Sequence, residues 1–180
     1  MNILIIILLV LAGVIALLLV LGLFMRKNHY VKREVILSVP RQKVFDFIKL
    51  LKNQEKFNTH AAEDADRIKE FKGTDGTVGF IYSWSGNKKA GKGEKEIKNI
   101  IEGKSIESEI RFVKPMVASA TIIMETESLP GEQTRVSWSN AGTLKYPINI
   151  MIPMMEKMLP KEMDKSLLAL KNILENEQNT

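Results

Sequence analysis

The first part of the chain is apolar without interruption. Residues 3–25 are all hydrophobic or glycine, and the first charged residue is Arg26. A helix needs roughly 20 apolar residues to cross the hydrocarbon core of a bilayer. A buried core helix would show a polar face, and a secretory signal would show a basic start and a cleavage site, but the sequence has neither. Residues 3–25 are therefore predicted to form a transmembrane helix.

Basic residues follow this helix, and none precedes it. Because basic flanks stay on the cytoplasmic side, we expect a single-pass membrane protein with its N-terminus outside and its soluble domain in the cytoplasm. Residues 26–30 are expected to form a juxtamembrane linker. Membrane lipids are expected partners, and the basic side chains predicted to meet their head groups are Arg26, Lys27, Lys32 and Arg33.

After the linker, the hydrophobic pattern changes its period twice. Apolar and polar residues alternate over 31–39, as in a half-buried strand. Over 40–51 the apolar residues recur at helical spacing, and a second short helix is expected at 54–57. Alternation then returns, in stretches separated by glycine- and proline-containing turns. The strands expected from it cover 67–71, 78–84, 94–101, 106–112, 117–127 and 133–141.

The last segment, 147–175, is helical by its pattern. Met163, Leu167, Leu170 and Leu174 form one apolar face of it, whereas Pro153 and Pro160 are expected to break or kink it. Residues 176–180 are expected to be a frayed tail. A strand, short helices, several antiparallel strands and a long helix make an α+β domain over 31–175.

This order of elements resembles the START-like superfamily, also described as SRPBCC or polyketide cyclase/dehydrase-like, whose helix-grip fold is shared with the birch-pollen allergen. The likeness is carried by segments 38–40, 44–48, 136–138 and 167–175, by Phe57, and by the glycine pairs Gly76, Gly79 and Gly91, Gly93. It implies a curved antiparallel sheet wrapped around a long C-terminal helix, with a cavity between them. Members of the superfamily bind lipids, sterols, quinones, plant hormones or polyketide intermediates, and a minority are enzymes. The resemblance thus implies a hydrophobic ligand, without implying a reaction.

Aromatic residues on strand faces and methionines around the two prolines are the candidates for lining such a cavity. Side chains of these kinds also fill ordinary cores, so both interpretations are open. Methionine can repack around varied apolar ligands, and a proline kink would make a natural gate. The candidates are Phe80, Tyr82, Trp84, Phe112, Trp138, Met151, Met154, Met155 and Met158.

Few residues suit catalysis or metal binding. The chain has two histidines and no cysteine. His29 is expected to be an interfacial residue of the linker, and His60 is expected to lie in a solvated loop. The acidic run 63–66 lacks the glycine and the final glutamate of a calcium loop, so an exposed loop is expected there. No catalytic residue, metal site or cofactor is predicted.

The net charge is +5, which raises the question of nucleic acid. The densest basic cluster alternates with glycines and acids, which predicts a hairpin with a solvated face rather than a nucleic-acid groove. Anionic lipid is a simpler partner for the positive charge, and no nucleic-acid partner is expected. The residues of this cluster are Lys88, Lys89, Lys92, Lys95 and Lys98.

Three functions remain open. The first is a membrane-anchored binding module for a lipid, quinone or similar hydrophobic small molecule. The second is a cyclase or aromatase-type enzyme acting on an apolar substrate, with Tyr82, Ser137 or Asn140 as hydrogen-bond donors. The third is a membrane-tethered interaction scaffold with a filled core, which a cavity below about 300 Å³ would favour.

Overall fold

The computed structural model describes residues 2–59, 66–87 and 91–177. Seven strands form one antiparallel sheet in the order β1-β7-β6-β5-β4-β3-β2, so the first strand pairs with the last. In chain order the strands are β1 (Asn28–Leu37), β2 (Ile68–Lys72), β3 (Ile81–Ser85), β4 (Lys92–Ile101), β5 (Ser105–Lys114), β6 (Ala118–Leu129) and β7 (Gln133–Thr143).

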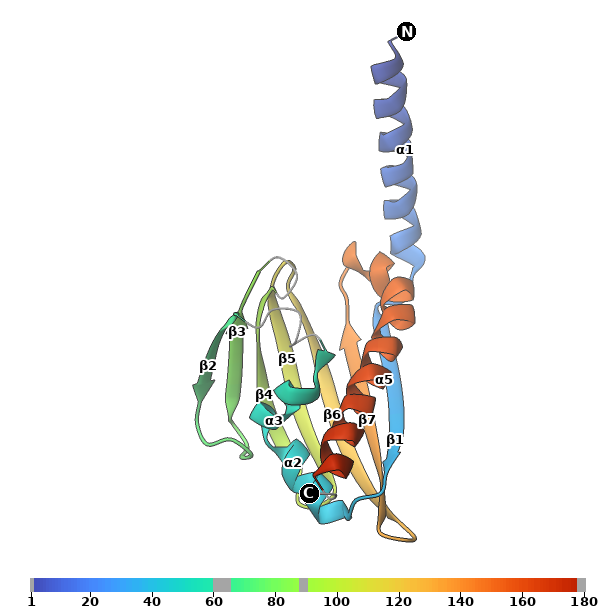
Figure 1. The fold of residues 1–180 in the computed structure, drawn as a ribbon. Coiled ribbons are helices and arrows are strands. Elements are labelled where there is room, and N and C mark those ends of the chain that lie inside the picture. Colours follow the sequence, from blue (N-terminus) through green and yellow to red (C-terminus); the bar gives the residue numbers. More distant parts are fainter. Residues whose placement is uncertain (1, 60–65, 88–90, 178–180) are drawn as a thin grey trace.

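All helices that the structure describes, except the N-terminal one, lie along one face of this sheet. The sheet curves around the long C-terminal helix and two short helices, whereas the N-terminal helix projects away from one end of the domain (Figure 1). The α+β helix-grip arrangement expected from the sequence is confirmed. The helical elements are α1 (Ile3–Phe24), α2 (Arg41–Lys49), α3 (Leu51–Phe57), the 3-10 helix η1 (Ile148–Met151) and α5 (Ile152–Asn176).

Burial follows the predicted patterns closely. The apolar face of α5 is fully covered by the sheet, with Met163, Leu167, Leu170 and Leu174 all buried. In α2 the buried residues are Val44, Phe45 and Ile48, at the expected helical spacing. Burying an apolar side chain of this size stabilises the fold by about 1.5–3 kcal/mol.

Several element boundaries differ by a few residues from the expected ones, and two departures involve glycine or proline. Strand β3 begins at Ile81 rather than at residue 78, because Gly76 and Gly79 have φ angles of +78° and +85° that interrupt extended backbone. Helix α5 is continuous, so the expected break at its prolines is wrong. Pro153 lies in the first turn, where its missing N–H has no partner to lose, and Pro160 lies inside the unbroken helix.

Helix α1 is long and apolar enough to span a membrane by length and composition. Its most apolar 18-residue window has a mean hydropathy of 3.6, and none of that window is buried. A core helix would be covered by the domain, so the exposure of this window argues against that alternative. Only its last turn meets the domain, at the buried Gly22.

Candidate functional site

A cavity of about 180 Å³ lies between the first half of α5 and strands β5, β6, β7 and β1. Most of the surface that faces the cavity is apolar. The apolar residues that line it are Ile110, Phe112, Ala118, Ala120, Ile122, Trp138, Leu144, Met155, Leu159 and Met163.

His29 is a polar residue of this cavity, and it does not lie in a linker. Strand β1 begins at Asn28, and its odd-numbered residues face α5, so the His29 side chain is buried with 5% exposure. Its ring lies over Gly142 of β7, where an added Cβ would come within 2.6 Å of the His29 Cε1. The expected interfacial position of His29 is therefore wrong.

Two buried polar atoms beside the cavity have no hydrogen-bond partner among the described residues. They are Nδ1 of His29 and Nε1 of Trp138. The other ring nitrogen of His29, Nε2, lies 2.9 Å from Oδ1 of Asn140, an acceptor, so Nε2 carries the proton. In a neutral imidazole Nδ1 is then an acceptor, whereas the indole Nε1 is a donor. Buried polar groups are rarely left unpaired, so these two atoms mark the site.

On its α5 side, the cavity lies next to hydrogen bonds that join α5 to the segment after α3. Oγ1 of Thr59 donates to Glu162 at 3.1 Å, and the Thr59 amide donates to Oγ of Ser166 at 3.2 Å. Lys165 forms an ion pair with the same Glu162 carboxylate at 2.9 Å. Glu162 and Ser166, which line the cavity, thus also attach α5 to the chain beyond α3.

The predicted cavity residues lie in three different places. Phe112, Trp138 and Met155 line the cavity. Met151 lies half-buried in η1, while Met154 and Met158 lie on the outer side of α5, with 51% and 56% exposure. Sequence reasoning missed Met163, Leu144 and His29, although the alternation that begins at Val31 extends back to His29 with the same parity.

The predicted residues Phe80, Tyr82 and Trp84 are buried on the other half of the sheet, apart from this cavity. Together with Phe71 they form an aromatic row. The ring centroids of Phe71 and Phe80 lie 6.2 Å apart, those of Phe71 and Tyr82 5.3 Å, and those of Tyr82 and Trp84 5.8 Å. Each such offset pair stabilises the fold by about 0.5–1.5 kcal/mol beyond the contribution of burial itself.

A charged cluster lies beside this row, between α3 and strands β2 and β3. The Glu55 carboxylate accepts hydrogen bonds from Arg67 and from the Tyr82 hydroxyl, the latter at 2.7 Å, and Lys69 lies 3.5 Å away. The side chains of Glu55 and Arg67 are only 13% and 6% exposed. Burial and the hydrogen bond to Glu55 raise the pKa of the Tyr82 hydroxyl, so it remains a donor. The Tyr82 hydroxyl is therefore committed to Glu55.

Lys95 joins the same region, so it is not part of a solvated basic face. The residue as a whole keeps intermediate exposure, but its ammonium group donates to Oε1 of the buried Gln54 at 2.5 Å. Burial lowers the pKa of Lys95 to about 8, and the Glu55 carboxylate opposes the shift. Of the other residues in that basic cluster, Lys98 pairs with Glu96 at 3.2 Å, and Lys88 and Lys89 lie outside the described residues.

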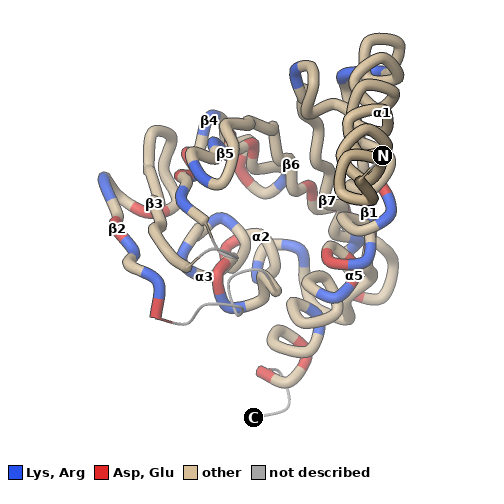
Figure 2. The backbone as a smooth tube through the Cα atoms, turned by 90° about the horizontal axis from the view of Figure 1, so that it is seen from above, with Lys and Arg blue, Asp and Glu red and all other residues tan. Residues whose placement is uncertain are grey.

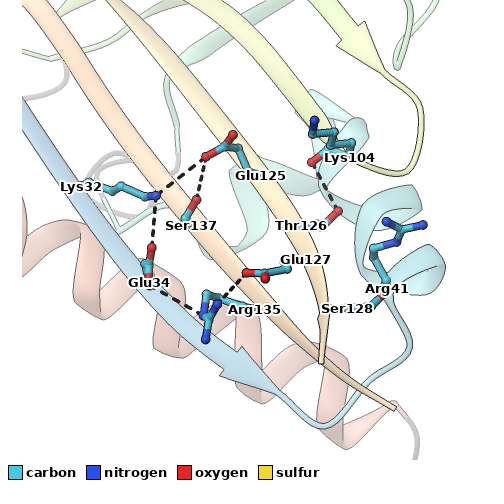
Figure 3. Close-up of a pocket in the computed structure, with 10 residues that line it drawn as sticks. All are labelled: Lys32, Glu34, Arg41, Lys104, Glu125, Thr126, Glu127, Ser128, Arg135 and Ser137. Carbon is cyan, nitrogen blue, oxygen red and sulfur yellow. Dashed lines mark hydrogen bonds and ion pairs between the residues drawn. The ribbon is translucent and has the colours of Figure 1, made fainter. Parts of the chain in front are cut away.

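The outer face of the sheet carries a separate, open depression of about 370 Å³ in which several charged side chains form ion pairs (Figure 3). Lys32 lies 3.2 Å from Glu34, and Arg135 lies 2.6 Å from Glu127. Ser137 also faces outward and donates to Glu125 at 3.1 Å, so it is not a donor in the cavity. This depression is a charged surface network.

The four basic residues expected at the membrane also lie in different places. Arg26 pairs with Glu156 of α5, and Lys27 is exposed next to the end of α1. Lys32 belongs to the outer network, and Arg33 lies on the inner side of β1, 3.3 Å from Asp164. Only Arg26 and Lys27 adjoin α1.

The remaining predicted features concern metal binding and the acidic loop. His60 and residues 63–65 lie outside the described residues. Among the residues that the structure describes, no three His, Cys, Asp or Glu side chains come together in a group able to hold a metal ion.

The sequence matches no protein-family model, and no curated protein matches it. Solved structures match its fold. A protein from Chromobacterium violaceum has a TM-score of 0.59 at 13% identity, over 81% of this chain and 96% of its own. The structure of Ara h 8.0201 has a TM-score of 0.58 at 13% identity, over 82% of this chain and 96% of its own. The Aha1 dimer from Colwellia psychrerythraea has a TM-score of 0.56 at 15% identity, over 82% and 96%.

Proposed function

We propose that this chain is a membrane-anchored module that binds a hydrophobic small molecule between the sheet and α5. The observation that carries the proposal is the mostly apolar cavity under the first half of α5, at the end of the domain from which α1 projects. A pocket held beside a bilayer meets a lipid-soluble ligand at a far higher effective concentration than a pocket free in water.

The cavity limits the shape of the ligand. At about 180 Å³ it is smaller than the roughly 300 Å³ at the lower end of usual ligand sites. It accommodates a small ring or the end of a chain, and a larger ligand requires Met155, Leu159 and Met163 to repack. The unpaired acceptor of His29 and donor of Trp138 suit a ligand with a polar end, such as a hydroxyl, which both donates and accepts.

The binding proposal is tested by extracting the full chain, purified in detergent, with organic solvent and identifying apolar molecules by mass spectrometry. Ala118→Leu places a larger side chain in the cavity, and Ala141→Leu makes the same change on the opposite face of the sheet. We expect one defined species with the natural chain and with Ala141→Leu, and its depletion with Ala118→Leu. Annular lipid around α1 is common to all three samples, so equal extracts would contradict the proposal.

The anchor is tested separately. We expect the protein in the membrane fraction to resist extraction by alkaline carbonate and to have the intact mass of residues 1–180. A mature protein that lacks α1 would instead identify the helix as a cleaved signal, which passes the same length and composition criteria.

A second candidate is the interaction scaffold, and the small volume of the cavity favours it. In that function the cavity is a packing imperfection and α1 only holds a partner at the membrane. The extraction experiment separates the two, because a scaffold yields no defined species from any of the three variants.

A further inference from the structure

The end of helix α1 is hydrogen-bonded to the domain. Three residues separate its last residue, Phe24, from Asn28 at the start of β1, a span of about 14 Å at most. The fully buried Asn149 of η1 donates from Nδ2 to the carbonyl oxygens of Gly22, at 2.7 Å, and Met25, at 3.1 Å. A bilayer that contains α1 therefore lies directly against this end of the domain.

Two segments at this end expose apolar side chains. The end of β5 and its connection to β6 expose Val113 and Val117, with 50% and 80% exposure. The first turns of α5 expose Met154 and Met158. Figure 1 shows that both segments reach the end of the domain from which α1 leaves. We call this pair of segments the apical rim.

The apical rim borders the cavity. Phe112 and Ala118, which line the cavity, flank the exposed segment between β5 and β6 in the sequence. Met155 and Leu159 line it from α5, each next to an exposed methionine. The cavity is thus bordered by exposed apolar residues on both sides.

The charge at this end suits an anionic surface. Four exposed lysines there have no ion-pair partner within the part of the chain that the structure describes, whereas the acidic Glu156 is neutralised by Arg26. Figure 2 looks down on this end, along α1. Each basic side chain near an anionic lipid surface strengthens binding to that surface about fivefold. The basic residues are Lys27, Lys114, Lys145 and Lys157.

The geometry points to the apical rim as a membrane-docking surface, which inserts its apolar side chains into the head-group region of an anionic bilayer and opens the cavity toward lipid. A hydrophobic ligand then passes between bilayer and cavity without crossing water. This inference rests on the proposed anchor and names the partner of the same site.

The test uses the full chain in vesicles of phosphatidylcholine with about one third phosphatidylserine. Because the chain has no cysteine, a polarity-sensitive fluorophore can be attached to single variants. Val117→Cys and Met154→Cys probe the two segments of the rim, and Ser128→Cys, at the opposite end of β6, is the control. We expect a blue shift and about twofold or greater brightening at the first two positions only.

One double variant probes the electrostatic contribution of the rim. Lys145→Glu combined with Lys157→Glu should reduce the brightening, and so should high salt. Vesicle flotation tests the docking surface and the membrane anchor separately. Floated protein whose rim labels report water overturns the docking surface and leaves the anchor intact. Protein that does not float overturns both.

Discussion

The two halves of the sheet bury their polar side chains differently. Under α3 the polar groups contact one another: Glu55 accepts from Arg67 and Tyr82, and Lys95 donates to Gln54. Under α5 the side chains surround a cavity, and His29 and Trp138 each keep one buried nitrogen without a partner among the described residues. The first half pairs its polar groups internally, whereas the second half leaves two of them open to the ligand that we propose. The variants below separate these two roles.

The largest effect is expected from Glu55→Ala. It leaves the buried Arg67 guanidinium without its carboxylate, and breaking a buried pair in this way costs about 3–5 kcal/mol. Denaturant unfolding of the detergent-purified protein measures this loss. Glu102→Ala is the control, because Glu102 is 63% exposed and its pair with Lys49 contributes about 1 kcal/mol at most. Equal losses in both variants would show that the buried Glu55 cluster contributes no more stability than an exposed ion pair.

Gly142→Ala should affect stability and ligand binding together. The added Cβ would meet Cε1 of His29 at 2.6 Å and the Ser119 carbonyl oxygen at 2.8 Å, so the imidazole must move. Such crowding costs about 1–3 kcal/mol. We expect lower stability in denaturant and less extracted ligand. Gly13→Ala, whose Cβ meets nothing within 4 Å, should change neither.

Stability should rise between pH 8 and pH 10 because of Lys95. The folded protein releases the Lys95 proton near pH 8, whereas the unfolded chain holds it up to the ordinary pKa of 10.5. Unfolding in this window takes up a proton, so raising the pH disfavours it, by on the order of 1–2 kcal/mol. Lys95→Met should flatten the profile of unfolding free energy against pH, and a slope that survives the substitution assigns the effect to other groups.

The smallest effect on stability is expected from Met155→Leu. The exchange conserves volume, so it should cost less than about 1.5 kcal/mol, yet a branched side chain repacks less easily around a ligand. The extraction experiment should show weaker ligand retention for Met155→Leu than for Met154→Leu, whose side chain is exposed. Equal ligand retention in both variants would exclude a role of Met155 in ligand uptake.

The sequence predicts the fold better than it predicts the site. Alternation and helical spacing locate every strand, because burial on one face imposes those periods. The site depends on contacts between distant segments. His29 looks like part of a basic linker until β1 is paired with β7, which places it over Gly142. Lys95 looks solvated, although its parity with the buried Gly93 and Ile97 indicates the inner face.

The pairing of β1 with β7 has a consequence for synthesis of the protein. Asn28 and Thr143, which bond through their side chains, are 115 residues apart, so the ribosome needs roughly 5–20 s to supply the partner of β1. During that interval β1, which has one apolar face, follows α1 without its partner strand β7. Substitutions in β1 should therefore reduce the yield of newly made protein more than they reduce the stability of molecules that have already folded.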